Sequence, residues 1–377
     1  MFEKPQRGRQ RLELDRLYTP NSPIGAGDRA PDFSLPDCHG APINLYTKIR
    51  GGTPLLVFYP DVGSFSAEAA DIGRAMDRVA PGEMDLFVII RAAAESLPEP
   101  SSEAMFVVAD EAGHTTNAYG FVTDSGPLAL RFDPNLRLTA LRAAGAEAVE
   151  HYVERHLAQS VAPARKVSSV APTLIVPHVL SPDFCQELID LHHSGGNHES
   201  TVTYNKDGQD VREVDPDQKS RFDHIVSDKG MNRRLTEAFG RRLNFEIEKA
   251  FQFRVAARDG FVVTRYDAEA NGHFSLHRDN VSPTTAHFRF AVTLNLNFGD
   301  YEGGWLRFPE YGPDLYAPET GGAIVFSCSN LHEATPVTAG TRYALLTFLF
   351  GATEAQQLKH SSSQTSGSQT AGLQSAR

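Results

Sequence analysis

Hydrophobic and polar positions alternate in two different ways along the chain. In the first part, three uninterrupted apolar runs typical of buried β-strands lie at 55–60, 85–92 and 104–110. A segment with helical spacing of its apolar residues, 67–80, separates the first two runs, and this order predicts a crossover between parallel strands. Residues 128–134 and 136–145 then predict a hairpin, and 146–159 a closing helix.

A second pattern begins after residues 160–172, which are rich in Ser, Pro and Ala and predict a linker. Two helical segments follow, at 180–193 and 231–251, the first with Ser181 as N-cap. From 252 onward, apolar runs at 261–266, 288–298 and 342–350 are separated by Gly, Asp and Pro and predict mainly β structure. The predicted parts are a flexible lead-in at 1–25, an α/β domain at 26–159, the linker, a mainly-β domain at 173–352 and a disordered tail at 353–377.

Length and composition narrow the class of protein. The chain has 377 residues, 41% of them hydrophobic, which suffices for two buried cores. Its net charge of −11 argues against a nucleic-acid-binding protein, which usually carries a basic surface. Three separate cysteines predict a reducing compartment. Because the start has no apolar signal region and no run reaches about 18 apolar residues, we expect a cytoplasmic protein without a membrane span.

The stretch HFSLHRDNVS (273–282) places polar chemistry between two strand-like runs. On a strand, residues two apart share a face, so His277 and Asp279 are predicted to point the same way and Arg278 the other. His332, just after another apolar run, is the best candidate for a third ligand. Two histidines and one carboxylate form the facial triad of non-haem Fe(II) oxygenases.

Arg342 adds a second element because it opens the apolar run 342–350. A buried arginine needs a partner, and a dicarboxylate co-substrate would supply one through a charge-assisted pair. The alternative is an ordinary salt bridge to a nearby Asp or Glu. Thr293 and Asn295 leave a similar choice open, because their shared face is either the wet interior of a barrel or the solvent side of a strand.

Four separated stretches carry a family resemblance: RYDAEANGHFSLHRD, FAVTLNLNF, YEGGWLRFPE and GGAIVFSCSNLHEATPVTAGTRYALLTF. Together they resemble the 2-oxoglutarate/Fe(II)-dependent dioxygenase superfamily, in its prolyl 4-hydroxylase-like branch, over about 173–352. The resemblance implies a double-stranded β-helix, a jelly roll with flanking helices. It also implies Fe(II), 2-oxoglutarate and O₂, with ascorbate as a further candidate cofactor.

The same resemblance assigns roles to individual residues. Arg342 would pair with the distal carboxylate of 2-oxoglutarate, and Tyr266 would line the co-substrate pocket. Asn295 falls where relatives often carry a tyrosine that contacts 2-oxoglutarate. The implied Fe(II) ligands are His277, Asp279 and His332.

Further substrate-side candidates come from position alone. His273 and Ser275 share the face of His277 if the strand is unbroken, although a hydrogen-bonded bystander is the alternative for His273. Arg289 would face substrate or remain a surface charge. The polar region 196–222 is a candidate lid.

The N-terminal domain resembles the peroxiredoxin branch of the thioredoxin fold over about 25–158, through GDRAPDFSLPDCHGAPINL, LLVFYPDVGSFSAEAA and VVADEAGHTTNAYGF. In that family a threonine is followed three residues later by the peroxidatic cysteine, which a helix N-terminus activates. Here Ser64 and Ala67 occupy the two places, and Pro127 stands near the place of the active-site arginine. Cys38 lies in a different loop. We therefore expect a scaffold without peroxidase activity, with a homodimer surface as one candidate role.

These observations predict an Fe(II)- and 2-oxoglutarate-dependent dioxygenase that hydroxylates a peptidyl or small amino-acid-like substrate, with succinate and CO₂ as co-products. The alternative is a catalytically silent binding or scaffold protein built from two degenerate domains. A thiol peroxidase is disfavoured by Ala67. We expect neither nucleic acid nor membrane as a partner.

Overall fold

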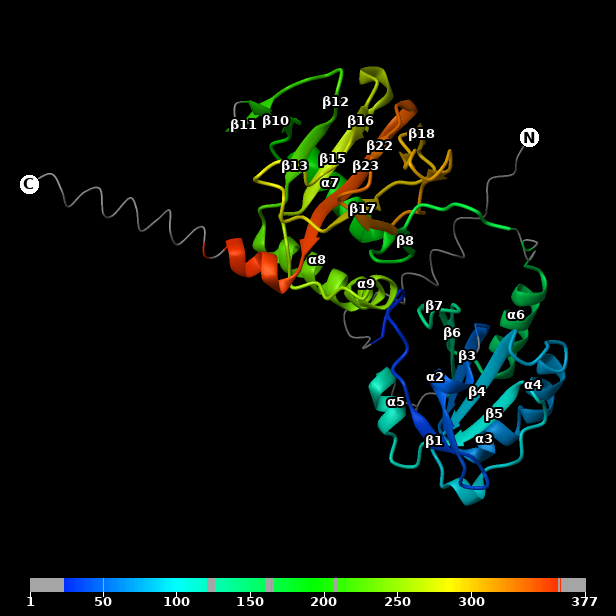
Figure 1. Ribbon diagram of the computed structural model, residues 1–377. Coiled ribbons are helices and arrows are strands. Elements are labelled where there is room, and N and C mark those ends of the chain that lie inside the picture. The colour runs from blue at the N-terminus through cyan, green and yellow to red at the C-terminus, as the bar shows by residue number, and fades with distance from the viewer. Residues whose placement is uncertain are drawn as a thin grey trace, which may run out of the picture. The chain divides into compact units, whose positions relative to one another are not determined.

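The computed structural model divides between Arg165 and Lys166 into two compact units, inside the segment expected to be a linker. Figure 1 shows the helices and strands of both units. Of the predicted lead-in, only Ile24 and Gly25 are described, and both are buried. The described residues are 24–49, 51–120, 126–159, 164, 166–206, 209–358 and 360.

The N-terminal unit is built on a mixed sheet whose strands pair in the order β5-β4-β3-β6-β7. The three apolar runs form parallel neighbours, which confirms the predicted crossover, and the predicted hairpin adds two antiparallel strands at one side. The sheet strands are β3 (Thr53–Tyr59), β4 (Met84–Ile90), β5 (Met105–Ala109), β6 (Leu128–Phe132) and β7 (Leu138–Arg142).

Helices cover both faces of this sheet, and each face has its own apolar core. The helix predicted at 67–80 is shorter in the structure, where it spans Ala69–Met76. A separate short helix, Val62–Ser66, ends just before Glu68, which is the N-cap residue of the second helix. A small hairpin of β1 (Ser34–Pro36) and β2 (Pro42–Asn44) stands apart from the sheet. The helices are α2 (Leu45–Lys48), α3 (Val62–Ser66), α4 (Ala69–Met76), η1 (Ala94–Ser96), α5 (His114–Tyr119) and α6 (Ala146–Leu157).

The C-terminal unit contains two antiparallel sheets whose facing surfaces enclose a cavity, as expected for a jelly roll. The larger sheet follows the order β8-β21-β17-β23-β15-β13-β9, with β14 and β18 also paired to β23. Its strands are β8 (Thr173–Val176), β9 (His198–Glu199), β13 (Phe222–Ile225), β14 (Ala257–Arg258), β15 (Val262–Asp267), β17 (Phe290–Asn295), β18 (Tyr301–Gly303), β21 (Ala323–Ser327) and β23 (Val337–Phe350).

The smaller sheet follows the order β12-β16-β22-β19-β20 and carries most of the polar chemistry. A short 3₁₀ turn, η3 (Ala268–Ala270), joins the larger sheet to it. Its strands are β12 (Lys219–Ser220), β16 (His273–His277), β19 (Leu306–Arg307), β20 (Leu315–Tyr316) and β22 (His332–Ala334).

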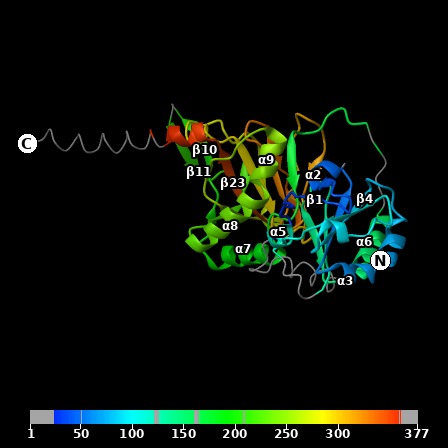
Figure 2. The ribbon, with the colours of Figure 1, turned by 90° about the horizontal axis from the view of Figure 1, so that it is seen from below.

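Three helices pack against the outer face of the larger sheet (Figures 1 and 2). In α7 (Pro182–Ser194) the Ser181 side chain accepts a hydrogen bond from the backbone N–H of Phe184, which confirms the predicted cap. The segment 231–251, predicted as one helix, is divided at Leu243 into α8 (Lys229–Arg242) and α9 (Asn244–Phe251). None of the described helices is long and apolar enough to cross a bilayer.

Two segments contain regular structure that the sequence did not predict. The region 196–222 contains a hairpin of β10 (Val202–Lys206) and β11 (Gln209–Glu213) as well as β9 and β12. Residues 352–358 are helical, where the sequence predicted a disordered tail from 353 onward. Glu354 explains this difference, because its buried carboxylate accepts a hydrogen bond from the backbone of Gly351 and pairs with Arg289. Residues 361–377 of the predicted tail lie outside the described part.

Candidate metal centre

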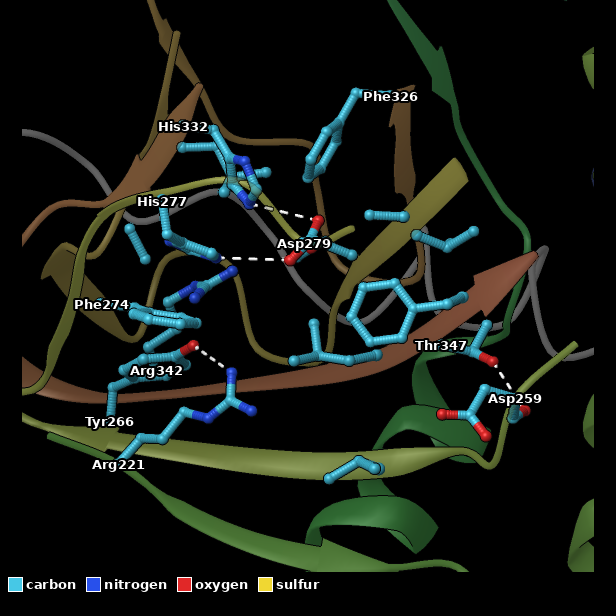
Figure 3. A pocket seen from close by; sticks show the side chains of 18 of the residues that line it. Arg221, Asp259, Tyr266, Phe274, His277, Asp279, Phe326, His332, Arg342 and Thr347 are labelled. Atoms are coloured by element: carbon cyan, nitrogen blue, oxygen red, sulfur yellow. Dashed lines mark hydrogen bonds and ion pairs between the residues drawn. The ribbon is translucent and has the colours of Figure 1, made fainter. Parts of the chain in front are cut away.

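Three side chains capable of binding a metal converge on the cavity between the two sheets (Figure 3). His277 is the last residue of β16 and lies directly opposite His332, the first residue of β22. The carboxylate oxygens of Asp279 lie 3.4 Å from His277 Nε2 and 3.6 Å from His332 Nε2. The donor atoms of the three residues all lie within 4.8 Å of one another.

The hydrogen bonds on the far side of each imidazole fix its tautomer. His277 Nδ1 lies 2.8 Å from the carbonyl oxygen of Ser275, and His332 Nδ1 lies 3.0 Å from that of Asn330. Because a carbonyl oxygen can only accept, each Nδ1 carries a proton, and a neutral ring then presents the lone pair of Nε2 to the cavity. Such backbone partners are typical of metal-bound histidines.

Charge and burial at these residues fit a cation. Burial lowers the pKa of His332, which favours its neutral form. Burial alone would raise the pKa of Asp279, but positive charge nearby holds it below its usual range: that of His332 and His277 when these rings are protonated, and that of Arg221. Asp279 Oδ2 is buried and accepts no hydrogen bond. Lone pairs from three residues therefore meet without a proton to share, which a divalent metal ion would remedy.

The backbone position of Asp279 differs from the prediction, although its side chain reaches the predicted site. The strand ends at His277, and Asp279 lies in the following turn, where its backbone N–H donates to the carbonyl of Cys328 at 3.0 Å. The expectation that both residues stand on one strand is therefore wrong, although their side chains do converge. Arg278 points away as predicted and pairs with Glu310 at 2.6 Å.

A β-bulge in β16 changes which residues share the face of His277. The pairing with β22 shifts between Phe274 and His277, so these two residues, three apart, lie on the same side. Their rings stack with centroids 3.5 Å apart, and Phe274 lines the cavity. His273 and Ser275 both contact the carbonyl oxygen of Asp217 instead. The expected shared face of His273 and Ser275 with His277 is therefore wrong, because it assumed an unbroken strand.

Arg342 lies in the cavity wall with its charge unpaired. The residue is 3% exposed, and its guanidinium donates to Asn295 Oδ1 at 3.3 Å. No described Asp or Glu forms an ion pair with it, and its Nε is buried without a hydrogen-bond partner. Among the described residues, Arg342 therefore does not form the local salt bridge that was the alternative. A buried arginine that has no carboxylate partner and leaves Nε free is suited to an anionic ligand.

The neighbours of Arg342 hold it in place. Tyr266 on β15 is its direct cross-strand partner on β23, and the guanidinium carbon lies 5.1 Å from the Tyr266 ring centroid. Asn295 is buried and donates to the carbonyl of Pro318 at 2.7 Å, which orients its oxygen toward Arg342. Asn295 thus contacts the arginine and is not among the residues that line the cavity.

Arg221 is a cavity residue that the sequence did not identify. Its Nη1 donates to the Tyr266 hydroxyl at 3.1 Å, and its guanidinium pairs with Asp223 at 3.0 Å. Burial opposes its charge, but Asp223 and Tyr266 raise the pKa of Arg221, so it remains protonated. The available signal was the spacing of Arg221 and Asp223 at the start of β13, which places both on one face.

The cavity has a volume of about 110 Å³ and combines these polar groups with apolar walls. Thr293 lines it and is buried, so this face of β17 points inward and is not the solvent side. Arg289 lies outside it, where Nη2 pairs with Glu354 at 2.8 Å. The apolar lining includes Val262, Val292, Leu306, Phe326, Leu346 and Phe348.

In the N-terminal unit, the position expected for a peroxidatic cysteine lies at the end of α3. Asp61 caps this short helix by accepting from the Ser64 backbone, and Ala67 follows its last residue. Close by, the Tyr59 hydroxyl donates to Glu68 Oε2 at 2.6 Å, and the same oxygen accepts from the Ala146 backbone. These polar groups are satisfied by one another, and no thiolate is available there.

The C-terminal unit is similar in sequence to a known protein family. Residues 261–350 match the sequence model described as the 2OG-Fe(II) oxygenase superfamily. A PKHD-type hydroxylase of Azoarcus sp. (strain BH72) is 34% identical over 92 residues, which cover 22% of this chain and 40% of the relative. The human multifunctional procollagen lysine hydroxylase and glycosyltransferase LH3 is 26% identical over 207 residues, or 53% of this chain and 26% of the relative. The chain thus spans less than half the length of these curated relatives.

Similar solved structures include a Pseudomonas putida prolyl-4-hydroxylase, at 16% identity and a TM-score of 0.37, covering 48% of this chain and 94% of that one. A prolyl hydroxylase from Trichoplax adhaerens, solved with a peptide fragment of hypoxia inducible factor, matches at 18% identity and a TM-score of 0.38. It covers 49% of this chain and 86% of that one.

Proposed function

We propose that the protein is a dioxygenase that hydroxylates its substrate, because residues 261–350 of the C-terminal unit match the 2OG-Fe(II) oxygenase superfamily. The single observation that carries the proposal is the convergence of three metal-binding side chains in a cavity that also contains an unpaired buried arginine. Fe(II) would be held by His277, Asp279 and His332.

Bound iron, together with 2-oxoglutarate and O₂, would supply the oxidising chemistry, with succinate and CO₂ as co-products. The chain contributes position and charge. Both Nδ1–H groups are held by backbone carbonyls, so the two imidazoles keep a fixed orientation toward Asp279. The apolar walls of the cavity limit the access of water.

Arg342 would bind the distal carboxylate of 2-oxoglutarate through its guanidinium, whose Nε has no hydrogen-bond partner in the protein. Asn295 would position Arg342 through the hydrogen bond at 3.3 Å. Tyr266 and Arg221 would form the adjoining wall, where the Arg221–Asp223 pair keeps the Arg221 charge neutralised and leaves Arg342 as the anion-binding group. Asn295 thus takes a positioning role and does not contact the co-substrate.

The substrate we propose is a peptidyl or small amino-acid-like molecule. Support comes from the relatives, because their names describe hydroxylases and several describe procollagen lysine hydroxylases. The β10–β11 hairpin is the candidate lid: Asp210 on it accepts from the Thr284 hydroxyl at 2.7 Å, in the segment that follows Asp279. Succinate release against a panel of peptides and free amino acids would identify the class.

For the N-terminal unit we propose a peroxiredoxin-like domain without peroxidase activity. The strand order β5-β4-β3-β6-β7, in which β6 alone runs opposite to the other four strands, supports a thioredoxin-type sheet. A role as a homodimer surface is testable by measuring the mass of the full-length chain in solution. A monomeric mass at micromolar concentration would remove that role.

The decisive experiment adds Fe(II) and 2-oxoglutarate without oxygen and records the weak visible charge-transfer band of the chelate. We expect the band in the wild-type chain and its loss in Asp279→Ala. A folded wild-type protein without the band would favour the silent scaffold instead. Persistence of the band in Asp279→Ala would exclude the proposed ligand set.

A further inference from the structure

A second group of metal-binding side chains comes together in the N-terminal unit. Cys38 and His39 lie in the turn between β1 and β2, and Glu99 lies in the segment that follows η1. Their donor atoms all lie within 4.8 Å of one another, and His39 Nε2 is 3.0 Å from a carboxylate oxygen of Glu99. Among the described residues, only this group and the triad of the C-terminal unit meet that condition.

The turn that carries two of these residues is fixed from within. Asp37 accepts hydrogen bonds from the backbone N–H groups of His39 and Ala41, both at 2.9 Å. Its own backbone N–H donates to the carbonyl of Ala41, and Gly40 closes the turn with a positive φ of 77°. The Asp37 oxygen Oδ1 is therefore engaged by the backbone, and the turn presents Cys38 and His39 in a defined conformation.

Both sides of the cluster are anchored to the fold. Cys38 is half-buried and packs against the core cluster formed by one face of the central sheet. Leu97, two residues before Glu99, is buried in the same core. The His39 and Glu99 side chains are 71% and 66% exposed, so they can adjust to a ligand.

We propose that Cys38, His39 and Glu99 bind one Zn²⁺ ion, with solvent in the remaining coordination position. A thiolate, an imidazole and a carboxylate are the ligands that zinc accepts, and three protein ligands leave one position open. Tetrahedral zinc places its donor atoms about 3.3–3.7 Å apart. The His39–Glu99 pair, at 3.0 Å, needs to open by only a few tenths of an ångström.

The choice of zinc over iron follows from the sulfur ligand. The C-terminal triad contains only nitrogen and oxygen donors, whereas a thiolate favours softer ions such as zinc. The ion would tie the β1–β2 turn to the segment after η1, two places separated by sixty residues in the chain.

Cobalt(II) is the probe for this site, because a thiolate ligand gives it an intense near-ultraviolet charge-transfer band. The full-length Asp279→Ala chain disables the other centre without touching this one. We expect the band on adding Co²⁺, its displacement by Zn²⁺, and its absence when Cys38→Ser is added. Cys185 and Cys328 are fully buried, so neither is accessible to added Co²⁺ as an alternative thiolate ligand.

Substitutions at two exposed glutamates test Co²⁺ binding without disturbing the fold. Glu99→Gln should weaken Co²⁺ binding at least tenfold, whereas Glu95→Gln, on η1 and also exposed, should leave the affinity unchanged. Absence of a thiolate band in the chain with intact Cys38 overturns the site. So does a band that persists in Cys38→Ser, or equal affinities in the two glutamate variants.

Discussion

His277 and His332 face each other as a direct cross-strand pair, and their ring centroids lie 4.2 Å apart. Each ring donates from Nδ1 to a backbone carbonyl two residues earlier, Ser275 for His277 and Asn330 for His332, so the pair keeps its geometry without a bound ligand. Asp279 alone reaches this pair from a turn outside the two strands. The centre therefore combines two ligands from regular strands with one that the turn places.

This arrangement predicts that a divalent ion stabilises the folded chain. Mn²⁺, which prefers nitrogen and oxygen ligands, should raise the Tm of the wild type by a few degrees at saturation, because it binds the folded state alone. His277→Ala should remove the shift, since it deletes one of the facing rings. Arg278→Gln is the matched control. Arg278 is next to His277 in the chain, but its side chain pairs with Glu310 away from the metal centre. Equal Mn²⁺ shifts in wild type and His277→Ala would contradict the assignment.

Much of this site could be predicted from the sequence because its signals are local. His332 follows the apolar run that forms β21, and Arg342 opens the apolar run that forms the later part of β23. The inward face of β17 followed from alternation, once burial settled which side Thr293 occupies. Periodicity therefore located these residues, while only the three-dimensional structure separated an anion-binding arginine from a salt-bridged one.

The features that escaped prediction depend on irregular backbone or distant contacts. The bulge between Phe274 and His277 leaves no mark in the alternation, so His273 and Ser275 were placed on the wrong face. The division of the predicted helix 231–251 at Leu243 was not predicted either, because the pattern of apolar residues does not mark it. Cys38 and Glu99 meet across sixty residues, and no local pattern indicates such a contact.

Arg342→Gln should raise the KM for 2-oxoglutarate. Losing charge-assisted hydrogen bonds worth about 1.5–3 kcal/mol corresponds to a roughly 10- to 150-fold increase. Arg289→Gln serves as the control, because that guanidinium pairs with Glu354 outside the cavity. The measurement is initial-rate succinate production at varied 2-oxoglutarate. A KM that moves equally in both variants would place the carboxylate elsewhere.

Gly304→Ala should damage both stability and co-substrate binding. Gly304 has a φ of +65°, and an added Cβ would lie 2.8 Å from Arg342 Cδ and 2.9 Å from Val337 Cγ2. We expect a loss of about 1–3 kcal/mol in the free energy of unfolding, together with a raised KM for 2-oxoglutarate. Gly299→Ala has a similar positive φ of 93° with open space around it. It should cost stability through the backbone alone and leave the KM unchanged, so a raised KM in both would remove the steric explanation.

Lys219 makes the stability of the C-terminal unit depend on pH. It is 6% exposed, its ammonium donates to the carbonyl of Thr201, and it lies 4.7 Å from the Phe274 ring centroid. Burial, reinforced by nearby Arg221, lowers its pKa from 10.5 to about 7. Between these values the unfolded chain binds a proton that the folded chain does not. Folding is therefore penalised as the pH falls from 10.5 toward 7, and the penalty is fully present below 7.

Lys219→Met removes this titration, so its stability relative to the wild type should increase as the pH falls. Taking the folded pKa as about 7, the difference should be roughly 2–3 kcal/mol more favourable to the variant at about pH 6 than at about pH 9. Urea unfolding with a chelator present would measure it without a bound metal. The exposed Lys249→Met variant controls for the loss of a lysine charge at a site that is not buried. Because the lost hydrogen bond and ring contact act at every pH, only the slope tests the argument, and parallel pH profiles for wild type and Lys219→Met would refute it.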